Sequence, residues 1–107
     1  MRQFEVYMCD IPILNGDVIG GARPCIIISN DMENMYSSRV IVIPTTSNMK
    51  RLDLPVNVKV NLEHESMAIC NQIMTLSKEN VGRYLTRLND FEIREIKTAI
   101  FNELGVL

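Results

Sequence analysis

Short apolar runs separated by turn-forming residues fill most of this chain, and they favour a fold built mainly of short strands. The clearest run is residues 56–62, where valine and leucine at every second position alternate with asparagine and lysine. Such alternation buries one face of a strand and leaves the other face in water. Further strands are predicted at residues 4–10, 24–29, 39–44, 66–73 and 84–88.

One helix is predicted, at the C-terminal end of the sequence. Asn89 is a natural N-cap, Glu92 stands three residues later as in a capping box, and Gly105 is a natural stop. An apolar stripe along this helix predicts packing on the core or on a second copy, and it consists of Ile93, Ile96, Ile100 and Leu104. The prediction is an α+β, mainly β, small-barrel domain of about five to seven short strands followed by this helix, with residues 1–107 as a single domain.

The charges of the chain are nearly balanced. It has 11 Lys and Arg residues against 13 Asp and Glu residues, a net charge of -2. This balance argues against a nucleic-acid binder that relies on bulk positive charge, so such binding would need a local basic patch. No segment has the roughly 18 apolar residues of a membrane helix, and the N-terminus has no signal pattern, so we expect a cytoplasmic protein without a membrane partner.

The sequence gives no sign that its cysteine and histidine residues have a catalytic or metal-binding role. Cys9, Cys25 and Cys70 are odd in number, far apart and embedded in apolar runs, so we expect them to be reduced core residues. The only histidine, His64, lies in a polar turn between two glutamates and is expected to be solvated and idle. With no metal-binding spacing among these residues, we expect no metal site.

Residues 20–24, Gly-Gly-Ala-Arg-Pro, place one arginine where a loop enters a predicted strand. The two glycines permit a sharp turn, and Pro24 biases Arg23 toward extended backbone geometry. A guanidinium held at such a junction presents paired donors that match phosphate oxygens. Alternatively, Arg23 is an ordinary surface or ion-paired arginine.

Residues 44–47, Pro-Thr-Thr-Ser, place three hydroxyl groups at or just beyond the end of another predicted strand. Hydroxyls in such turns often satisfy nearby backbone groups, which is the alternative to a functional role. Together with a fixed guanidinium, however, a hydroxyl cluster indicates chemistry on a phosphate.

The ordered segments GGARP, IISND, IVIPTTS, LPVNVKV, NQIMTLSKENVGR and ELGVL resemble the MazF/PemK toxin family, from about Val6 to Val106. The resemblance implies the SH3-like small barrel of the CcdB/PemK fold and a homodimer. It implies cleavage of single-stranded RNA at short sequences without a metal or other cofactor. It also implies a cognate antitoxin, whose C-terminal segment occupies the dimer's RNA groove and with which the toxin binds DNA.

By the same resemblance, the catalytic residues are Arg23 and Thr46. RNA supplies its own nucleophile, the 2′-OH, so cleavage would leave a 2′,3′-cyclic phosphate and a 5′-OH. Local RNA contacts are expected from neighbouring hydroxyl groups, two basic residues and the loop before Arg23, namely Thr45, Ser47, Lys50, Arg51, Asp17 and Gly21.

Some positions depart from the family pattern. Val18 stands where an acidic residue is common, with Asp17 beside it, and Met74 stands where arginine is frequent. Two other classes of function therefore stay open. One is a binding module, either a weakened relative that holds RNA or antitoxin or a gyrase-binding protein of the CcdB type, although residues 103–107 lack the aromatic that the latter uses. The other is a structural or regulatory barrel, consistent with the net charge of -2.

Overall fold

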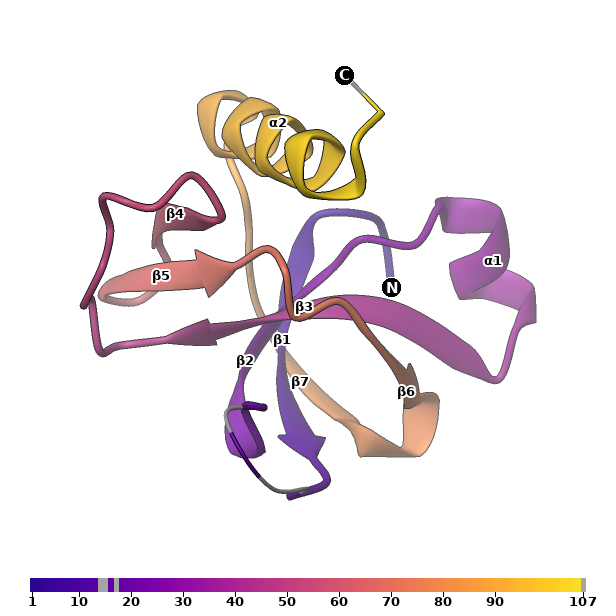
Figure 1. Ribbon diagram of the computed structural model, residues 1–107. Helices are drawn as coiled ribbons and strands as arrows, with labels where there is room; N and C mark the ends of the chain where they lie inside the picture. The colour runs from indigo at the N-terminus through magenta and orange to yellow at the C-terminus, as the bar shows by residue number, and fades with distance from the viewer. Residues whose placement is uncertain (14–15, 17, 107) are drawn as a thin grey trace.

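The computed structural model describes residues 1–13, 16 and 18–106. Figure 1 shows a bent sheet with one long helix packed on it and a short helix at its side. The elements in chain order are β1 (Glu5–Ile11), β2 (Gly21–Ile27), α1 (Asp31–Tyr36), β3 (Arg39–Thr46), β4 (Asn57–Asn61), β5 (Glu65–Ile69), β6 (Met74–Ser77), the 3₁₀ turn η1 (Lys78–Asn80), β7 (Val81–Arg87) and α2 (Asp90–Leu104).

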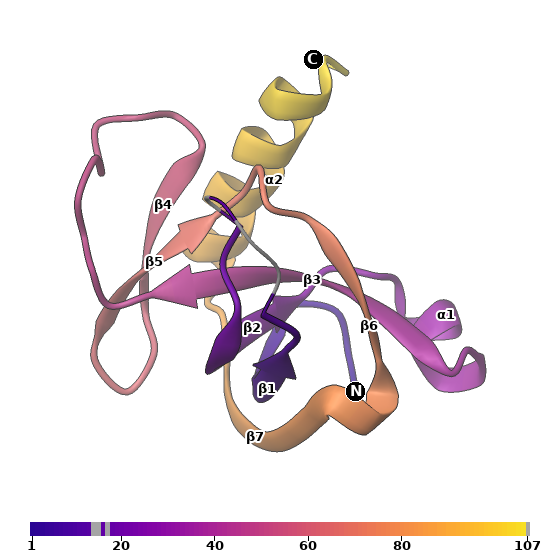
Figure 2. The same cartoon turned by 60° about the horizontal axis from the view of Figure 1, so that its bottom comes forward.

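The strands pair in the order β4-β5-β3-β2-β1-β7, and β6 pairs with β3 beside this path. Each pairing is antiparallel. The long strand β3 crosses the molecule, as both ribbon views show, and joins its two halves (Figure 1, Figure 2). The predicted mainly β fold with a C-terminal helix is confirmed, and the seven described strands form an open sheet with β4 and β7 at its ends.

The strand predicted at residues 66–73 is wrong in its extent, because this segment contains the end of β5 and a turn before β6. The amide of Gln72 donates to the carbonyl of Ile69 (3.1 Å), which closes the turn. The turn is needed because β5 pairs with the end of β3 while β6 pairs with its beginning. No glycine or proline marks this turn in the sequence, where only the polar pair Asn71 and Gln72 interrupts the apolar residues.

The predicted capping box of α2 is confirmed, and it also ties the helix to the sheet. The buried Glu92 carboxylate accepts hydrogen bonds from the backbone N–H of Asn89 (2.9 Å) and from the backbone N–H of Asn61 in β4 (2.7 Å). Ile96 is fully buried in the core, whereas Leu104, at the end of the predicted stripe, is 60% exposed. The helix is therefore fixed by its first three turns, and its last turn extends beyond the core.

The three cysteines are buried and free, as predicted. Burial raises the pKa of the Cys70 thiol to about 12, and contact with Cys9 followed by burial raises the pKa of Cys25. Because the thiolate is the reactive form, we expect no modification of Cys70 or Cys25 by iodoacetamide in the native protein at pH 8. Mass spectrometry checks this, with urea-unfolded protein, alkylated at all three positions, as the control. Rapid labelling of either thiol before unfolding would contradict the expectation.

Candidate active site

The register of the sheet brings Arg23 and Thr46 together. In the pairing of β2 with β3, Cys25 lies opposite Pro44, and the antiparallel register continued by two residues sets Arg23 level with Thr46. A hydrogen bond from Nη1 of Arg23 to the carbonyl oxygen of Thr45 (3.2 Å) joins the two segments. Residues that are 23 positions apart in the sequence therefore share one end of the sheet.

The guanidinium of Arg23 is held by backbone oxygens and not by a carboxylate. Its Nε and Nη2 both donate to the carbonyl oxygen of Gly20 (3.2 and 3.0 Å), in addition to the bond from Nη1 to Thr45. These bonds use three of the five N–H groups of an arginine and leave two for a ligand. Among the described residues, no ion pair neutralises Arg23. The side chain is thus a fixed, half-buried and uncompensated positive charge.

The two glycines before Arg23 have different structural roles. Gly21 has a φ of 88°, in the left-handed region that glycine adopts without strain. A Cβ on Gly20 would lie 2.9 Å from Cα of Ile13 and 3.1 Å from the carbonyl oxygen of Pro12, so a side chain there would collide with the other limb of the loop. This close approach positions the Gly20 carbonyl that anchors Arg23.

The two threonine hydroxyls at the end of β3 are not equivalent. Thr45 is buried, and its hydroxyl donates to the carbonyl oxygen of Pro24 (2.8 Å), which fastens β3 to β2. Thr46 is half-buried, and its hydroxyl oxygen accepts from the amide of Asn48 (3.1 Å). That bond leaves the hydroxyl hydrogen of Thr46 available to donate to a ligand.

These groups open into a pocket of about 250 Å³. It is lined by Ala22, Arg23, Pro24, Thr45, Thr46, Ser47, His64 and Ser66. The structure thus unites the predicted Arg23 with the predicted hydroxyl cluster. It also adds His64, for which the sequence indicates no role, because pairing of β5 with the end of β3 carries the β4–β5 turn to this edge. No local motif in the sequence signals that placement.

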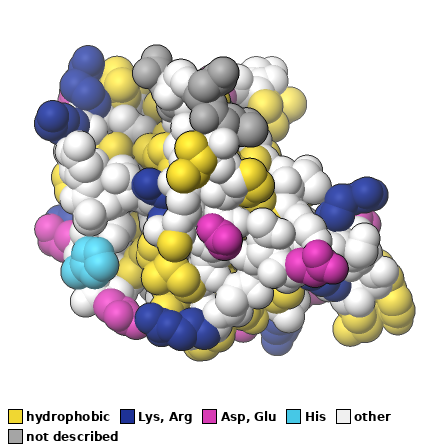
Figure 3. Space-filling model, turned by 90° about the horizontal axis from the view of Figure 1, so that it is seen from below, with side chains coloured by type: hydrophobic (Ala, Val, Ile, Leu, Met, Phe, Trp, Pro, Cys, Tyr) yellow, Lys and Arg dark blue, Asp and Glu magenta, His cyan; other side chains and the backbone are white. Residues whose placement is uncertain are grey.

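Three other described candidates, Lys50, Arg51 and Gly21, lie outside the pocket lining. Lys50 is exposed in the loop after β3. Arg51, in the same loop, forms a two-pronged ion pair with the carboxylate of Asp53 (3.1 Å for each bond), which raises the pKa of Arg51 and lowers that of Asp53. Gly21 adjoins the site through the backbone, and Asp17 lies outside the described residues. The face in Figure 3 accordingly mixes basic and acidic side chains instead of forming one basic patch.

Val18 and Met74, two of the positions at which the sequence departs from the expected family pattern, line one separate pocket of about 200 Å³. Its other described walls are mostly apolar and include Ile11, Ile19 and Leu76. The two side chains therefore lie close together in the fold although they are 56 positions apart in the sequence. This pocket and the Arg23 pocket share no lining residue.

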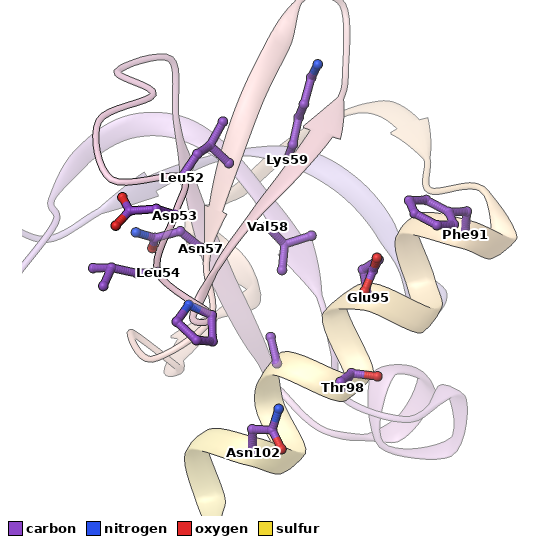
Figure 4. A pocket seen from close by; sticks show the side chains of 12 residues that line it. Leu52, Asp53, Leu54, Asn57, Val58, Lys59, Phe91, Glu95, Thr98 and Asn102 are labelled. Atoms are coloured by element: carbon purple, nitrogen blue, oxygen red, sulfur yellow. The ribbon is translucent and has the colours of Figure 1, made fainter.

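A larger hollow of about 390 Å³ lies between the loop after β3, strand β4 and helix α2. Figure 4 shows Leu52 and Leu54 of the loop on one side and Phe91 and Glu95 of the helix on the other, with Val58 between them. It contains none of the predicted catalytic residues. We therefore assign the candidate active site to the pocket of about 250 Å³, where a guanidinium with two unused donors and a hydroxyl with one unused donor converge.

Two further features of the described residues bear on the class of protein. None of its helices combines the length and the apolar character needed to cross a membrane. Within the same residues, no cluster of three or more histidine, cysteine or acidic side chains has the arrangement of a metal site.

Comparison with known proteins places the whole chain in one group. The family model described as PemK-like, MazF-like toxin of type II toxin-antitoxin system matches residues 2–103. Endoribonuclease MazF of Staphylococcus saprophyticus is 35% identical over 111 aligned positions, which cover 99% of this chain and 92% of the relative.

Solved structures agree with this assignment. A mycobacterial endoribonuclease in complex with its cognate antitoxin is 25% identical and superposes with a TM-score of 0.85, covering 100% of this chain and 97% of the other. MazF of Deinococcus radiodurans, at 18% identity, shares the fold with a TM-score of 0.88 and covers 98% of this chain and 96% of its own. The chain therefore belongs to the PemK-like, MazF-like toxins of type II toxin–antitoxin systems.

Proposed function

We propose that this toxin, an endoribonuclease of its family, cleaves single-stranded RNA without a metal at the pocket formed by Arg23 and Thr46. The observation that supports the site most directly is the convergence of two unused guanidinium donors and one unused hydroxyl donor in an open pocket. A phosphodiester offers oxygen acceptors and a negative charge, which are the groups that such donors bind.

The proposed chemistry follows from what each group can do. In the transition state, charge builds on the two non-bridging phosphate oxygens while the 2′-oxygen attacks phosphorus and the 5′-oxygen leaves. Arg23 binds these oxygens with its remaining N–H groups, and because its anchors are backbone carbonyls it needs no rearrangement to do so. Thr46 donates a further hydrogen bond to the phosphate. Neighbouring groups, including Ser47, Lys50 and Arg51, are proposed to contact the flanking nucleotides.

A direct test uses the purified protein, a long defined single-stranded RNA and excess chelator. We expect discrete cuts, fragments with a 5′-OH that polynucleotide kinase labels without prior phosphatase treatment, and a cyclic phosphate on the other side of each cut. In a matched control substrate, a 2′-deoxynucleotide replaces the ribonucleotide that supplies the 2′-OH at one mapped cut, and cleavage there is expected to disappear. RNA that is bound but left intact by folded protein would instead support the binding module.

Replacing Thr46 with valine is expected to lower kcat for RNA cleavage by about 10- to 100-fold, because one hydrogen bond to the transition state is lost while side-chain shape is kept. The amide of Asn48, which loses its partner, is near the surface and can bond water instead. Single-turnover kinetics on one mapped site measure the effect, and Thr46→Ser, which keeps the hydroxyl, serves as the control. Equal rates for the two variants would contradict a role for this hydroxyl.

We also propose that the protein acts in the cytoplasm as a homodimer that a cognate antitoxin inhibits. The antitoxin partner is supported by the solved complexes of a mycobacterial relative and of Deinococcus MazF with MazE. A dimer is supported by large apolar side chains that are exposed in the monomer, among them Met32, Met35 and Tyr36 of α1. Light scattering after gel filtration measures the mass, and a monomer at micromolar concentration would contradict the dimer.

A further inference from the structure

Cleavage at the Arg23 pocket leaves one chemical need unmet, which is a proton for the departing 5′-oxygen. An alkoxide is a strong base and leaves poorly unless it is protonated. Arg23 does not supply this proton efficiently, because a guanidinium stays protonated throughout the working pH range. The hydroxyl of Thr46 is a weaker acid than an imidazolium. The pocket therefore needs a donor that gains and loses a proton near neutral pH.

His64 is the one imidazole in the lining of this pocket, and imidazole is the side chain that most often serves as a general acid or base. The other lining residues carry hydroxyl, aliphatic or guanidinium side chains. His64 is therefore the candidate proton donor of this pocket, both by its side-chain chemistry and by its position.

The backbone of the β4–β5 turn holds His64 in place while its side chain stays open to solvent. The carbonyl oxygen of His64 accepts hydrogen bonds from the amide of Leu62 (3.1 Å) and the hydroxyl of Ser66 (3.4 Å). In addition, Met67 pairs with Thr46, so the turn is joined directly to the catalytic strand. Figure 3 shows the imidazole, in cyan, exposed on the face of the molecule seen from below.

The charged neighbours of His64 are engaged elsewhere. Glu65 pairs with Lys59 of β4 (2.9 Å), and Glu63 pairs with Arg83 of β7 (3.8 Å). Among the described residues, no ion pair or hydrogen bond holds the imidazole itself. The charged side chain that lines the same pocket is Arg23, which would bind the same phosphate. A substrate in this pocket thus meets both a cation and an imidazole.

We propose that His64 is the general acid of the reaction and protonates the 5′-oxygen as it leaves. The 2′-oxygen forms a bond to phosphorus and releases its proton to water, while the bond from phosphorus to the 5′-oxygen breaks. The 5′-oxygen takes a proton from the imidazolium, and neutral imidazole regains one from solvent. This role rests on the proposed cleavage at Arg23 and Thr46 and deepens it.

The test changes the leaving group. After a cut site is mapped, two RNA oligonucleotides are made with that site, one normal and one with sulfur in place of the bridging 5′-oxygen. A thiolate leaves without protonation, so loss of a general acid slows cleavage of the oxygen substrate only. Single-turnover rates are measured for the native protein and for the variants His64→Ala, His64→Gln, Glu65→Gln and Arg23→Ala.

We expect both His64 variants to cut the oxygen substrate about 100-fold or more slowly, yet to cut the sulfur substrate within about threefold of the native rate. Glu65→Gln, in the same turn but outside the pocket lining, is expected to stay near the native rate on both. Because His64 is exposed, we expect its variants to have the same urea midpoint of unfolding as the native protein. This midpoint is measured for each variant alongside the cleavage rates.

Three results would overturn the assignment. Native-like cleavage of the oxygen substrate by His64→Ala would remove any role, and equal losses on both substrates would show that His64 binds RNA or shapes the pocket. In both cases, continued slow cleavage by Arg23→Ala would leave the proposed function standing. A native protein that cuts neither substrate would overturn both proposals.

Discussion

Arg23→Ala is expected to lower kcat for RNA cleavage by about 1,000-fold or more while leaving the protein folded. A preorganised hydrogen-bond donor at a developing charge contributes about 100- to 1,000-fold, and a full positive charge on a phosphoryl group contributes more. Arg23 combines both contributions, with two unused donors and no carboxylate among the described residues to weaken its charge.

The matched control for this prediction is Arg23→Lys, which keeps the charge but not the planar fork. A lysine ammonium lacks the planar fork with which arginine can bond the Gly20 carbonyl and a phosphate at the same time. We therefore expect an intermediate loss of cleavage rate, of about 100-fold. Single-turnover cleavage of one mapped site, together with thermal unfolding of each variant, separates loss of chemistry from loss of structure. An alanine variant that stays folded and keeps a tenth or more of the native rate would contradict the assignment of the site.

Ile96→Ala is expected to lower the free energy of unfolding by about 2–5 kcal/mol, a large part of the total stability of a chain of this size. Ile96 is fully buried among residues from the N-terminal segment and from β4, including Phe4, Val6 and Val60. Removing most of its side chain loses buried apolar surface and leaves a cavity beneath α2, where the helix contacts β4.

The control for Ile96 is Leu104→Ala on the same predicted stripe. Leu104 is 60% exposed, so its truncation is expected to cost less than about 1 kcal/mol in a monomer. Urea denaturation of both variants at one fixed protein concentration measures the difference. Equal losses would indicate that a second copy covers Leu104, because association adds to apparent stability.

Local signals in the sequence were sufficient for most of the secondary structure. The capping box at Asn89 and Glu92 and the alternation in residues 56–62 specify α2 and β4, because capping and side-chain periodicity act between near neighbours. The turn between β5 and β6 was not predicted from the sequence. It forms because β5 and β6 both pair with β3, which is a long-range contact and not a local signal.

The same distinction between local and long-range signals applies to the candidate active site. The sequence by itself determined that Arg23 stands at a loop–strand junction and that hydroxyls cluster at residues 45–47, since both are properties of short segments. Only the tertiary structure decided that Thr46, and not Thr45, has a hydroxyl free for a ligand, because that depends on a hydrogen bond across strands to Pro24. It alone placed His64 in the pocket, since pairing of β5 with β3 is a long-range contact without a local sequence signature.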